Sequence, residues 1–334
     1  MRESPQRLWQ VYSPEIPEFL RRFAATPPVQ RLRLVGMNCG CEYTAFPRFA
    51  AWAPYSRFDH SVGVGLIVWH FTGDIRQAVA GLLHDIATPP FAHAVDFLAG
   101  DHLQQEATEG GTEALIRSSP ELRSLLAEFG LTWEQVSDYH RYPIADNPSP
   151  QLSADRLEYT LGDLLSYGLA EIPQLQSFYG DLEIRNNEHG IPELAFQTPE
   201  TGLAFTEAAL SVFRIYVAEE DRFSMQALAD LLRLALEKGA LDPEDLRGTE
   251  PAVIQKLEAD PACSRAWNRF CAYHRLLQRR QRPEGGYWVQ VPAKLRYIDP
   301  LVSGAVRASQ LSPRVRSLLE DFRQTDFSHW LSAE

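Results

Sequence analysis

The sequence predicts a mainly α fold, a bundle of helices that carries a small β-hairpin and, near its C-terminal end, a short β-like segment. Apolar residues recur at spacings of three and four, the pattern of a helix with one buried face, in stretches spread over much of the chain. Strand-like alternation occurs instead in residues 178–205, around the polar turn NNEHG, and in residues 286–300.

The expected helices follow one another along the chain and are separated by loops. They cover SVGVGLIVWHF (61–71), DIRQAVAGLLHDI (74–86), AVDFLAG (94–100), TEALIRSSPELRSLLAEF (112–129), DRLEYTLGDLLSYGL (155–169) and RFSMQALADLLRLALEKG (222–239). Proline and glycine mark the loops TPP, NPSPQ and RPEGG. Pro89 and Pro90 end the second helix, and Pro90 is placed to open the next one, whose first turn contains His93.

The composition argues against several classes of function. The 334 residues carry 32 basic and 44 acidic side chains, and the net charge of −12 opposes general attraction to nucleic acid or to an anionic membrane. A local basic pocket is still compatible with this charge, and it would be built mostly from arginines because only three basic residues are lysines. The sequence shows no secretory h-region and no spanning apolar run, and four cysteines are too few for a secreted disulfide framework. We therefore expect a soluble, cytoplasmic protein.

The stretch GLLHDIATPPFAH (81–93) places His84 directly beside Asp85 in an otherwise apolar segment. An isolated pair of this kind is more often a surface pair or a capped helix end. The sequence offers two further candidate ligands. His60 lies at the start of another apolar helix, and Asp155 lies at the start of a third. Imidazole and carboxylate groups are both good ligands for a divalent cation, so three helices could bring four ligands together.

These residues carry a resemblance to a known family. RFDHSVGVG, LLHDIATPPFAH and SADRLEYTLGD resemble, in that order, the H…HD…D signature of the HD-domain metal-dependent phosphohydrolases. The stretch TPPVQRLRLVGMNCGCEYTAFP resembles the branch of deoxynucleoside triphosphate triphosphohydrolases. The resemblance implies an HD-type core over residues 20–225, including the hairpin, and leaves residues 226–334 as a helical extension with the strand-like segment.

The same resemblance assigns roles to individual residues. It implies one divalent metal ion held by His60, His84, Asp85 and Asp155, and Mn, Fe, Mg, Zn and Ni are all compatible with this ligand set. It also implies a general-acid or phosphate contact for His93, a phosphate contact for Arg57, sugar contacts for Tyr159 and Asp163, and a nucleotide pocket at Arg214 and Tyr216. The alternatives are a buried histidine packed behind the metal site for His93, a surface arginine for Arg57 and a core aromatic for Tyr159.

The chain also departs from the family pattern. The family places a glycine and a second histidine shortly after the HD dipeptide, where this chain has Ala87 and Thr88. A further family histidine is replaced by Gln105, with His102 one helical turn earlier. Threonine and glutamine can hydrogen-bond a phosphate but cannot deliver a proton at neutral pH as imidazole can. The family glutamine beside the sugar falls at Met37 or Asn38, so the sugar preference is open.

Three functions are compatible with these observations. The first is metal-dependent hydrolysis of a nucleotide phosphate ester, with deoxynucleoside triphosphates as the leading substrate and tripolyphosphate as the product. The second is a phosphomonoesterase on the same scaffold, which would explain the missing histidines. The third is a non-catalytic nucleotide sensor, although retention of all four metal-ligand positions favours catalysis. We expect a homo-oligomer by family analogy only. His140 is the residue that we would suspect if a second metal were present.

Overall fold

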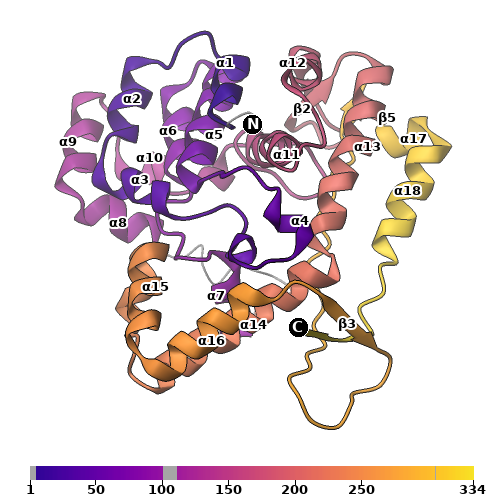
Figure 1. Ribbon diagram of the computed structural model, residues 1–334. Helices are drawn as coiled ribbons and strands as arrows, with labels where there is room; N and C mark the ends of the chain where they lie inside the picture. The colour runs from indigo at the N-terminus through magenta and orange to yellow at the C-terminus, as the bar shows by residue number, and fades with distance from the viewer. Residues whose placement is uncertain (1–4, 101–110, 305) are drawn as a thin grey trace.

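The computed structural model describes residues 5–100, 111–304 and 306–334. Helices dominate it, as the periodicity predicts (Figure 1). The first part contains α1 (Leu8–Tyr12), α2 (Glu18–Ala24), α3 (Pro27–Arg31), α4 (Pro47–Ala50), α5 (Arg57–Thr72), α6 (Ile75–Leu83), α7 (His93–Ala99), α8 (Thr112–Ser118), α9 (Pro120–Glu128) and α10 (Trp133–Val136). The second part contains α11 (Ala154–Ser166), α12 (Ile172–Gly180), α13 (Pro199–Tyr216), α14 (Glu219–Glu237), α15 (Glu250–Ala259), α16 (Pro261–Ala272), α17 (Ala308–Leu311) and α18 (Pro313–Arg323). Short 3-10 turns lie at Pro5–Arg7, Leu32–Leu34, Cys41–Tyr43, Tyr139–Arg141 and Pro243–Arg247.

Helix α5 runs through the middle of the first part and packs on α6 and α11. A capping box fixes its start, because Ser56 accepts a hydrogen bond from the backbone of Asp59 and the Asp59 side chain accepts one from the backbone of Ser56. It ends at Thr72, and the following Gly73 adopts the left-handed conformation that glycine tolerates best. Residues 57–68 of α5 are all buried, so this helix has no solvent face over its first three turns.

The segment after α6 departs from one detail of the prediction. Helix α6 ends at Leu83, and residues 84–92 form turns and loop before α7 begins at His93. Pro90 therefore does not open the next helix, although His93 does lie in its first turn. Phe91 and Ala92 both have positive φ angles, of 62° and 43°, and this backbone conformation is incompatible with an earlier start of the helix.

The predicted hairpin is confirmed between β1 (Leu182–Asn186) and β2 (Pro192–Phe196), which pair in antiparallel register. Strand β2 also pairs in parallel with β4 (Leu301–Val302), which pairs with β5 (Val306–Arg307), so the C-terminal part of the chain extends the hairpin into a four-stranded sheet. Strands β3 (Leu276–Arg279) and β6 (Trp330–Ala333) form a separate two-stranded sheet. The β-like stretch at 286–300 forms no regular strand and contributes one bridge, Val289 to Leu331.

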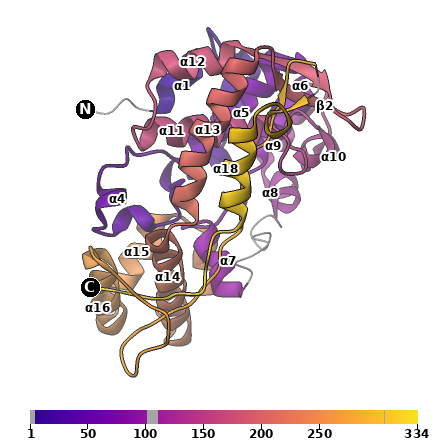
Figure 2. The same ribbon diagram turned by 90° about the vertical axis from the view of Figure 1, so that its right-hand side faces the viewer.

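Two clusters of buried apolar side chains form the core. One joins α5, α6, α11 and α13, and α18 lies alongside α13 at its edge (Figure 2). The other joins α7, α14 and α16. Helix α14 runs through residue 225, where the predicted core and extension meet, and the division of the chain at that point stays a prediction.

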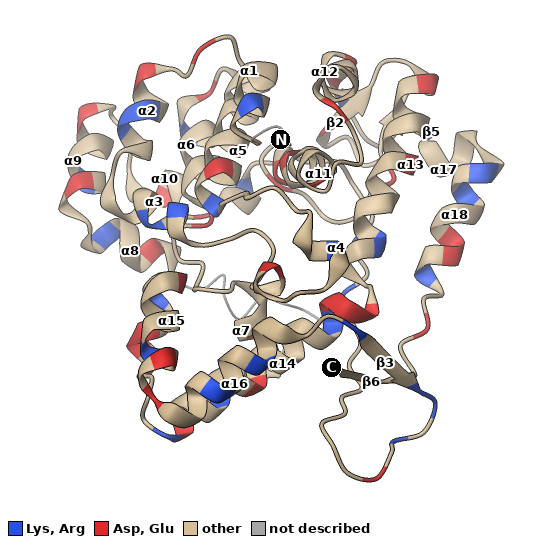
Figure 3. Ribbon diagram, in the orientation of Figure 1, with Lys and Arg blue, Asp and Glu red and all other residues tan. Residues whose placement is uncertain are grey.

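Charged side chains of both signs are interspersed along the outer helices α15 and α18, whereas the charged side chains of α16 are both arginines (Figure 3). In the described part of the chain, no helix combines the length and the apolarity that are needed to cross a membrane.

Candidate metal centre and its cavity

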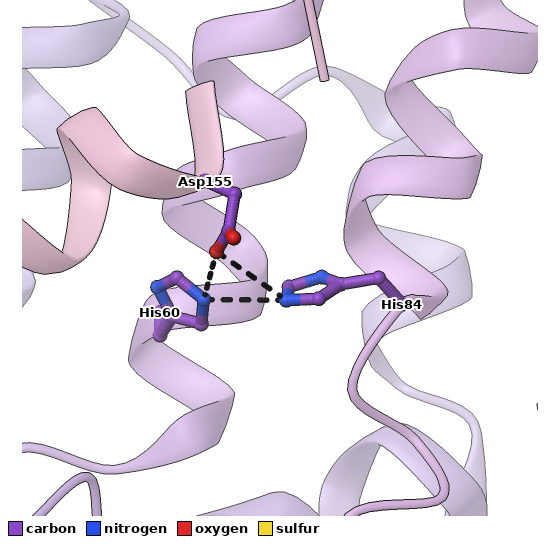
Figure 4. Close-up of side chains that lie close together, drawn as sticks. All are labelled: His60, His84 and Asp155. Carbon is purple, nitrogen blue, oxygen red and sulfur yellow. Dashed lines mark hydrogen bonds and ion pairs between the residues drawn. The ribbon is translucent and has the colours of Figure 1, made fainter. Parts of the chain in front are cut away.

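Three of the predicted ligands meet at one point, and they come from α5, from the turn after α6 and from α11 (Figure 4). His60 lies in the first turn of α5, His84 directly follows α6, and Asp155 lies in the first turn of α11 behind the N-cap Ser153. His60 Nε2 is 3.0 Å from Asp155 Oδ1 and 3.3 Å from His84 Nε2. His84 Nε2 is 3.7 Å from the same Asp155 oxygen. The packing of α5 on α6 and α11 therefore brings residues 24 and 95 positions apart in the chain into one cluster.

The donor set of this cluster fits a cation. His84 Nδ1 lies 2.7 Å from the carbonyl oxygen of Gly81, which can only accept, so the N–H of neutral His84 is at Nδ1 and a lone pair is at Nε2. His60 Nδ1 lies 2.6 Å from Glu158 Oε2, which assigns the same tautomer to neutral His60. Two nitrogen lone pairs and a carboxylate oxygen then converge, and they repel one another unless a positive charge lies between them.

The raised pKa of His60 also indicates that the cluster attracts a positive charge. Burial lowers this pKa, but hydrogen bonds to Asp155 and Glu158 outweigh burial and raise it to about 10. The site thus holds a positive charge either as a proton on His60 or as a metal ion. Within the described residues, His60, His84 and Asp155 form the one group of metal-ligating side chains whose ligand atoms lie within 4.8 Å of one another.

Asp85 lies at the edge of the cluster and is held by other partners. Its Oδ2 is 3.6 Å from His84 Nε2 and accepts a 2.7 Å hydrogen bond from Arg57 Nη1, while Oδ1 accepts one of 2.7 Å from the Thr88 hydroxyl. Burial raises the pKa of Asp85, but the Arg57 guanidinium holds it well below its usual range. Asp85 is therefore an ionised carboxylate beside the three clustered groups, and its role as a fourth ligand stays a prediction. Arg57 is only 7% exposed, so it is not a loose surface arginine.

His93 faces the same cavity. Its Nδ1 lies 2.8 Å from Asp96 Oδ2, and its Nε2 lies 3.5 Å from Arg296 Nη2. Burial lowers the pKa of His93, and the charges of Arg296 and Arg57 add to this effect while Asp96 opposes it. At neutral pH His93 is therefore a neutral imidazole with its N–H toward Asp96 and a lone pair toward the cavity.

The cavity beside the cluster has a volume of about 790 Å³. Its lining includes most of the predicted site residues: Asn38, Arg57, His60, His84, Asp85, Thr88, His93, Asp155, Tyr159, Asp163 and Tyr216. Arg214 is absent from this lining and is exposed. Positions two apart on a helix point about 200° from one another, so Tyr216 and Arg214 of α13 cannot both face the cavity.

His140 lines the cavity with its Nδ1 2.7 Å from Asp146, outside the metal cluster. His102 and Gln105 lie outside the described residues.

The chain is similar in sequence to several known proteins. An uncharacterized protein, YdhJ, from Bacillus subtilis is 27% identical over 241 residues, which cover 72% of this chain and 71% of that protein. A metal-dependent phosphohydrolase, cns2, from Cordyceps militaris is 28% identical over 53% of this chain and 49% of its own length. The deoxynucleoside triphosphate triphosphohydrolase SAMHD1 of Gallus gallus is 28% identical over 36% of this chain and 22% of its own length. No family model matches the chain.

Solved structures show the same fold. A phosphohydrolase from Bacteroides thetaiotaomicron superposes with a TM-score of 0.64 at 16% identity and covers 96% of both chains. A hypothetical protein from Aquifex aeolicus superposes with a TM-score of 0.63 at 20% identity and covers 92% of this chain and 95% of its own. The chain is a relative of the HD-domain metal-dependent phosphohydrolases.

The structure adds residues to this HD-type site that the sequence did not single out. Glu158 lies one helical turn after Asp155, and its spacing of three could have indicated that both share a face of α11. Asp221 also lines the cavity, and burial raises its pKa to about 8, as it raises that of Asp163 to about 7. Lys294 and Arg296 also line the cavity, from the segment of residues 286–300 near the C-terminal end. Nothing in their sequence neighbourhood indicates this placement.

Proposed function

We propose that this protein is a metal-dependent hydrolase of nucleotide phosphate esters, with deoxynucleoside triphosphates as the leading substrates. The observation that carries the proposal is the convergence of His60, His84 and Asp155 at the wall of a cavity of about 790 Å³. A volume of this size is in the range of small-molecule sites and can hold a whole nucleotide. The match to a metal-dependent phosphohydrolase supports the class of reaction, and the partial match to a deoxynucleoside triphosphate triphosphohydrolase supports the class of substrate.

The side chains of the cavity suit the two ends of a nucleotide. Arg57, His93 and Arg296 gather near the cluster and suit phosphate oxygens. Tyr159 and Tyr216 lie with their ring centroids 6.3 Å apart and supply an aromatic wall for a sugar or base. The buried Nδ2 of Asn38 has no hydrogen-bond partner among the described residues and can donate to a ligand.

His60, His84 and Asp155, with Asp85 beside them, are the residues that would hold the divalent ion. When bound, such an ion supplies a Lewis acid for a phosphoryl oxygen and lowers the pKa of a bound water. The chain itself orients the phosphate through Arg57, whose guanidinium is held by Asp85. His93 Nε2 takes up the proton that the attacking water releases and returns it to the leaving oxygen, and Asp96 stabilises the imidazolium that forms.

A phosphomonoesterase is the second candidate, and one contact favours it. The Thr88 hydroxyl donates a hydrogen bond to the Asp85 carboxylate. Thr88 therefore holds Asp85 at the position where the family has a histidine. A site with fewer groups devoted to phosphate would serve a shorter phosphate chain. The two candidates differ in the bond that is broken, because a triphosphohydrolase releases nucleoside and tripolyphosphate whereas a phosphomonoesterase releases orthophosphate.

The deciding experiment is product analysis. The purified full chain is loaded in turn with Mn, Fe, Mg, Zn or Ni and incubated with nucleoside mono-, di- and triphosphates, and the products are separated by chromatography. We expect tripolyphosphate from at least one deoxynucleoside triphosphate, and orthophosphate from a monophosphate would favour the second candidate. His84→Ala should abolish hydrolysis and lower the metal content, whereas His189→Ala, on the exposed hairpin turn, should change neither. If the wild-type protein yields neither product with any metal, it is a nucleotide sensor or acts on another substrate.

A further inference from the structure

We propose that the segment of residues 286–300 supplies Lys294 and Arg296 as a cationic subsite for the outer phosphates of a polyphosphate chain. The inference rests on the proposed function, because it assumes that a phosphate ester binds in the cavity. It assigns a role to a part of the chain for which the sequence indicated none. Both residues line the same cavity as the metal cluster.

The segment is held firmly on both sides of these two residues. Before them, the carbonyl oxygen of Val291 accepts a 2.6 Å hydrogen bond from Arg222 Nη1, and Arg222 is only 1% exposed. After them, Ile298 is 1% exposed and belongs to the cluster of buried apolar side chains that joins α5, α6, α11 and α13. The backbone N–H of Asp299 donates to the carbonyl oxygen of Pro150 at 2.9 Å. The segment between these anchors cannot leave the cavity without breaking core contacts, so its cations are preorganised.

The local backbone places both cations together. The N–H of Arg296 donates to the carbonyl oxygen of Lys294 at 3.1 Å, which closes a tight turn between them. This geometry agrees with the presence of both side chains in the cavity wall.

Arg296 differs from the other arginines of the cavity in its partners. Arg57 is paired with Asp85 and Arg156 with Asp146, each at 2.7 Å. Among the described residues, Arg296 makes no ion pair within 4.0 Å, and its guanidinium lies 3.5 Å from His93 Nε2. A guanidinium has five N–H donors, so this single contact leaves most of them for an anion. Arg296 is half-buried, and partial removal of such a charge from water is costly unless an anionic ligand completes the site.

Arg296 lies next to a residue with a proposed role in the reaction. It lies beside His93, the proposed proton carrier, while Arg57 lies beside the HD carboxylate. A phosphate at the metal cluster would have Arg57 and His93 as partners. The added charges of Lys294 and Arg296 therefore suit further phosphates of the same ligand, which is the feature that separates a triphosphate from a monophosphate.

The test compares two anions on the full chain saturated with Mn²⁺. Calorimetry measures the binding of inorganic tripolyphosphate and of orthophosphate to the wild type, Arg296→Gln and Lys294→Gln. We expect each variant to bind tripolyphosphate about 10- to 100-fold more weakly, because a charge-assisted hydrogen bond is lost, and to bind orthophosphate almost unchanged. Arg296→Lys should recover part of the affinity. Arg280→Gln, which removes an exposed charge next to β3, is the matched control and should bind both anions like the wild type.

The outcomes separate this inference from the proposed function. Tripolyphosphate affinity that is unchanged in both variants, or an equal loss for both anions, overturns the subsite. A thermal unfolding midpoint equal to that of the wild type shows that a loss of affinity does not come from misfolding. If the selective loss is found but no nucleotide is hydrolysed, the subsite stands as a polyphosphate site and the proposed function fails. If triphosphates are hydrolysed with the same KM by all variants, the proposed function stands and the subsite fails.

Discussion

Glu158 positions His60, a proposed metal ligand, and its replacement should weaken metal binding without removing any ligand. Its Oε2 lies 2.6 Å from His60 Nδ1, and the carboxylate is 1% exposed. The hydroxyls of Tyr55 and Tyr12 both donate to the same carboxylate, Tyr12 from 3.4 Å. Gly63 of α5 leaves the space that Glu158 fills, because a Cβ at this position would lie 2.4 Å from Glu158 Oε1. The carboxylate is thus fixed from three sides and in turn fixes the ring of His60.

The magnitude follows from what each substitution removes. Loss of a partner that orients a metal-ligating histidine weakens metal binding about 10- to 100-fold, or about 1.4 to 2.7 kcal/mol. In Glu158→Gln the amide oxygen still accepts the His60 N–H, so the tautomer is kept and only the charge is lost. We therefore expect about a 10-fold loss for this variant. Gly63→Ala keeps Glu158 but forces its side chain to move. Three atoms of the Glu158 side chain would lie within 2.7 Å of the new Cβ. We expect a loss of about 100-fold there.

The assay is calorimetric titration of the metal-free protein with Mn²⁺ or Zn²⁺, with metal content checked by elemental analysis. Gly180→Ala is the matched control, since a Cβ at that position meets no atom within 4 Å. Tyr12→Phe removes only the most distant of the hydroxyls and should have a small effect. Wild-type affinity in both Glu158→Gln and Gly63→Ala would refute the reasoning, because it would mean that His60 needs no orienting partner.

Three further predictions concern other groups. His93→Ala should lower turnover about 10²- to 10⁴-fold, the usual contribution of general acid catalysis, with the metal still bound; loss of the metal as well would place His93 in the coordination shell. Asp85→Ala should remove most of the metal by elemental analysis and destabilise the fold by about 3 to 5 kcal/mol in urea denaturation, because Arg57 loses its buried counter-ion; unchanged metal content would make the HD pair structural. Burial, with Glu250 nearby, raises the pKa of Glu42 from 4.5 to about 8. The native state therefore binds the extra proton, and stability should fall as the pH rises from 4.5 to 8, less so in Glu42→Gln; parallel profiles in the two proteins would contradict this assignment.

The sequence predicted those parts of the molecule that depend on local signals. The apolar periodicity of α5 and α11 and the alternation around NNEHG are local patterns, and the structure confirms the helices and the hairpin. The HD resemblance led to His60, His84 and Asp155, which the fold brings together. Arg214 was chosen with Tyr216 by resemblance, although the helical period separates the two side chains.

The remaining features depend on contacts between distant segments. Strand β4 joins β2 across more than a hundred residues, and two-residue strands have no pattern of their own to predict. Lys294 and Arg296 reach the cavity because Val291 and Ile298 are anchored in the core, and that anchoring depends on partners elsewhere in the chain. No periodicity within residues 286–300 could have indicated these partners.

The structure gives a reason for metal binding that is independent of any family. His84 must place its lone pair toward His60, because its other nitrogen faces the carbonyl oxygen of Gly81. The Asp155 carboxylate lies against both rings and cannot satisfy two lone pairs, since it also only accepts. A single proton on His60 would relieve one contact and leave the Nε2 of His84 facing Asp155 without a donor. A divalent cation satisfies all three groups at once, so the arrangement favours metal over proton even though the proton alone would bind tightly.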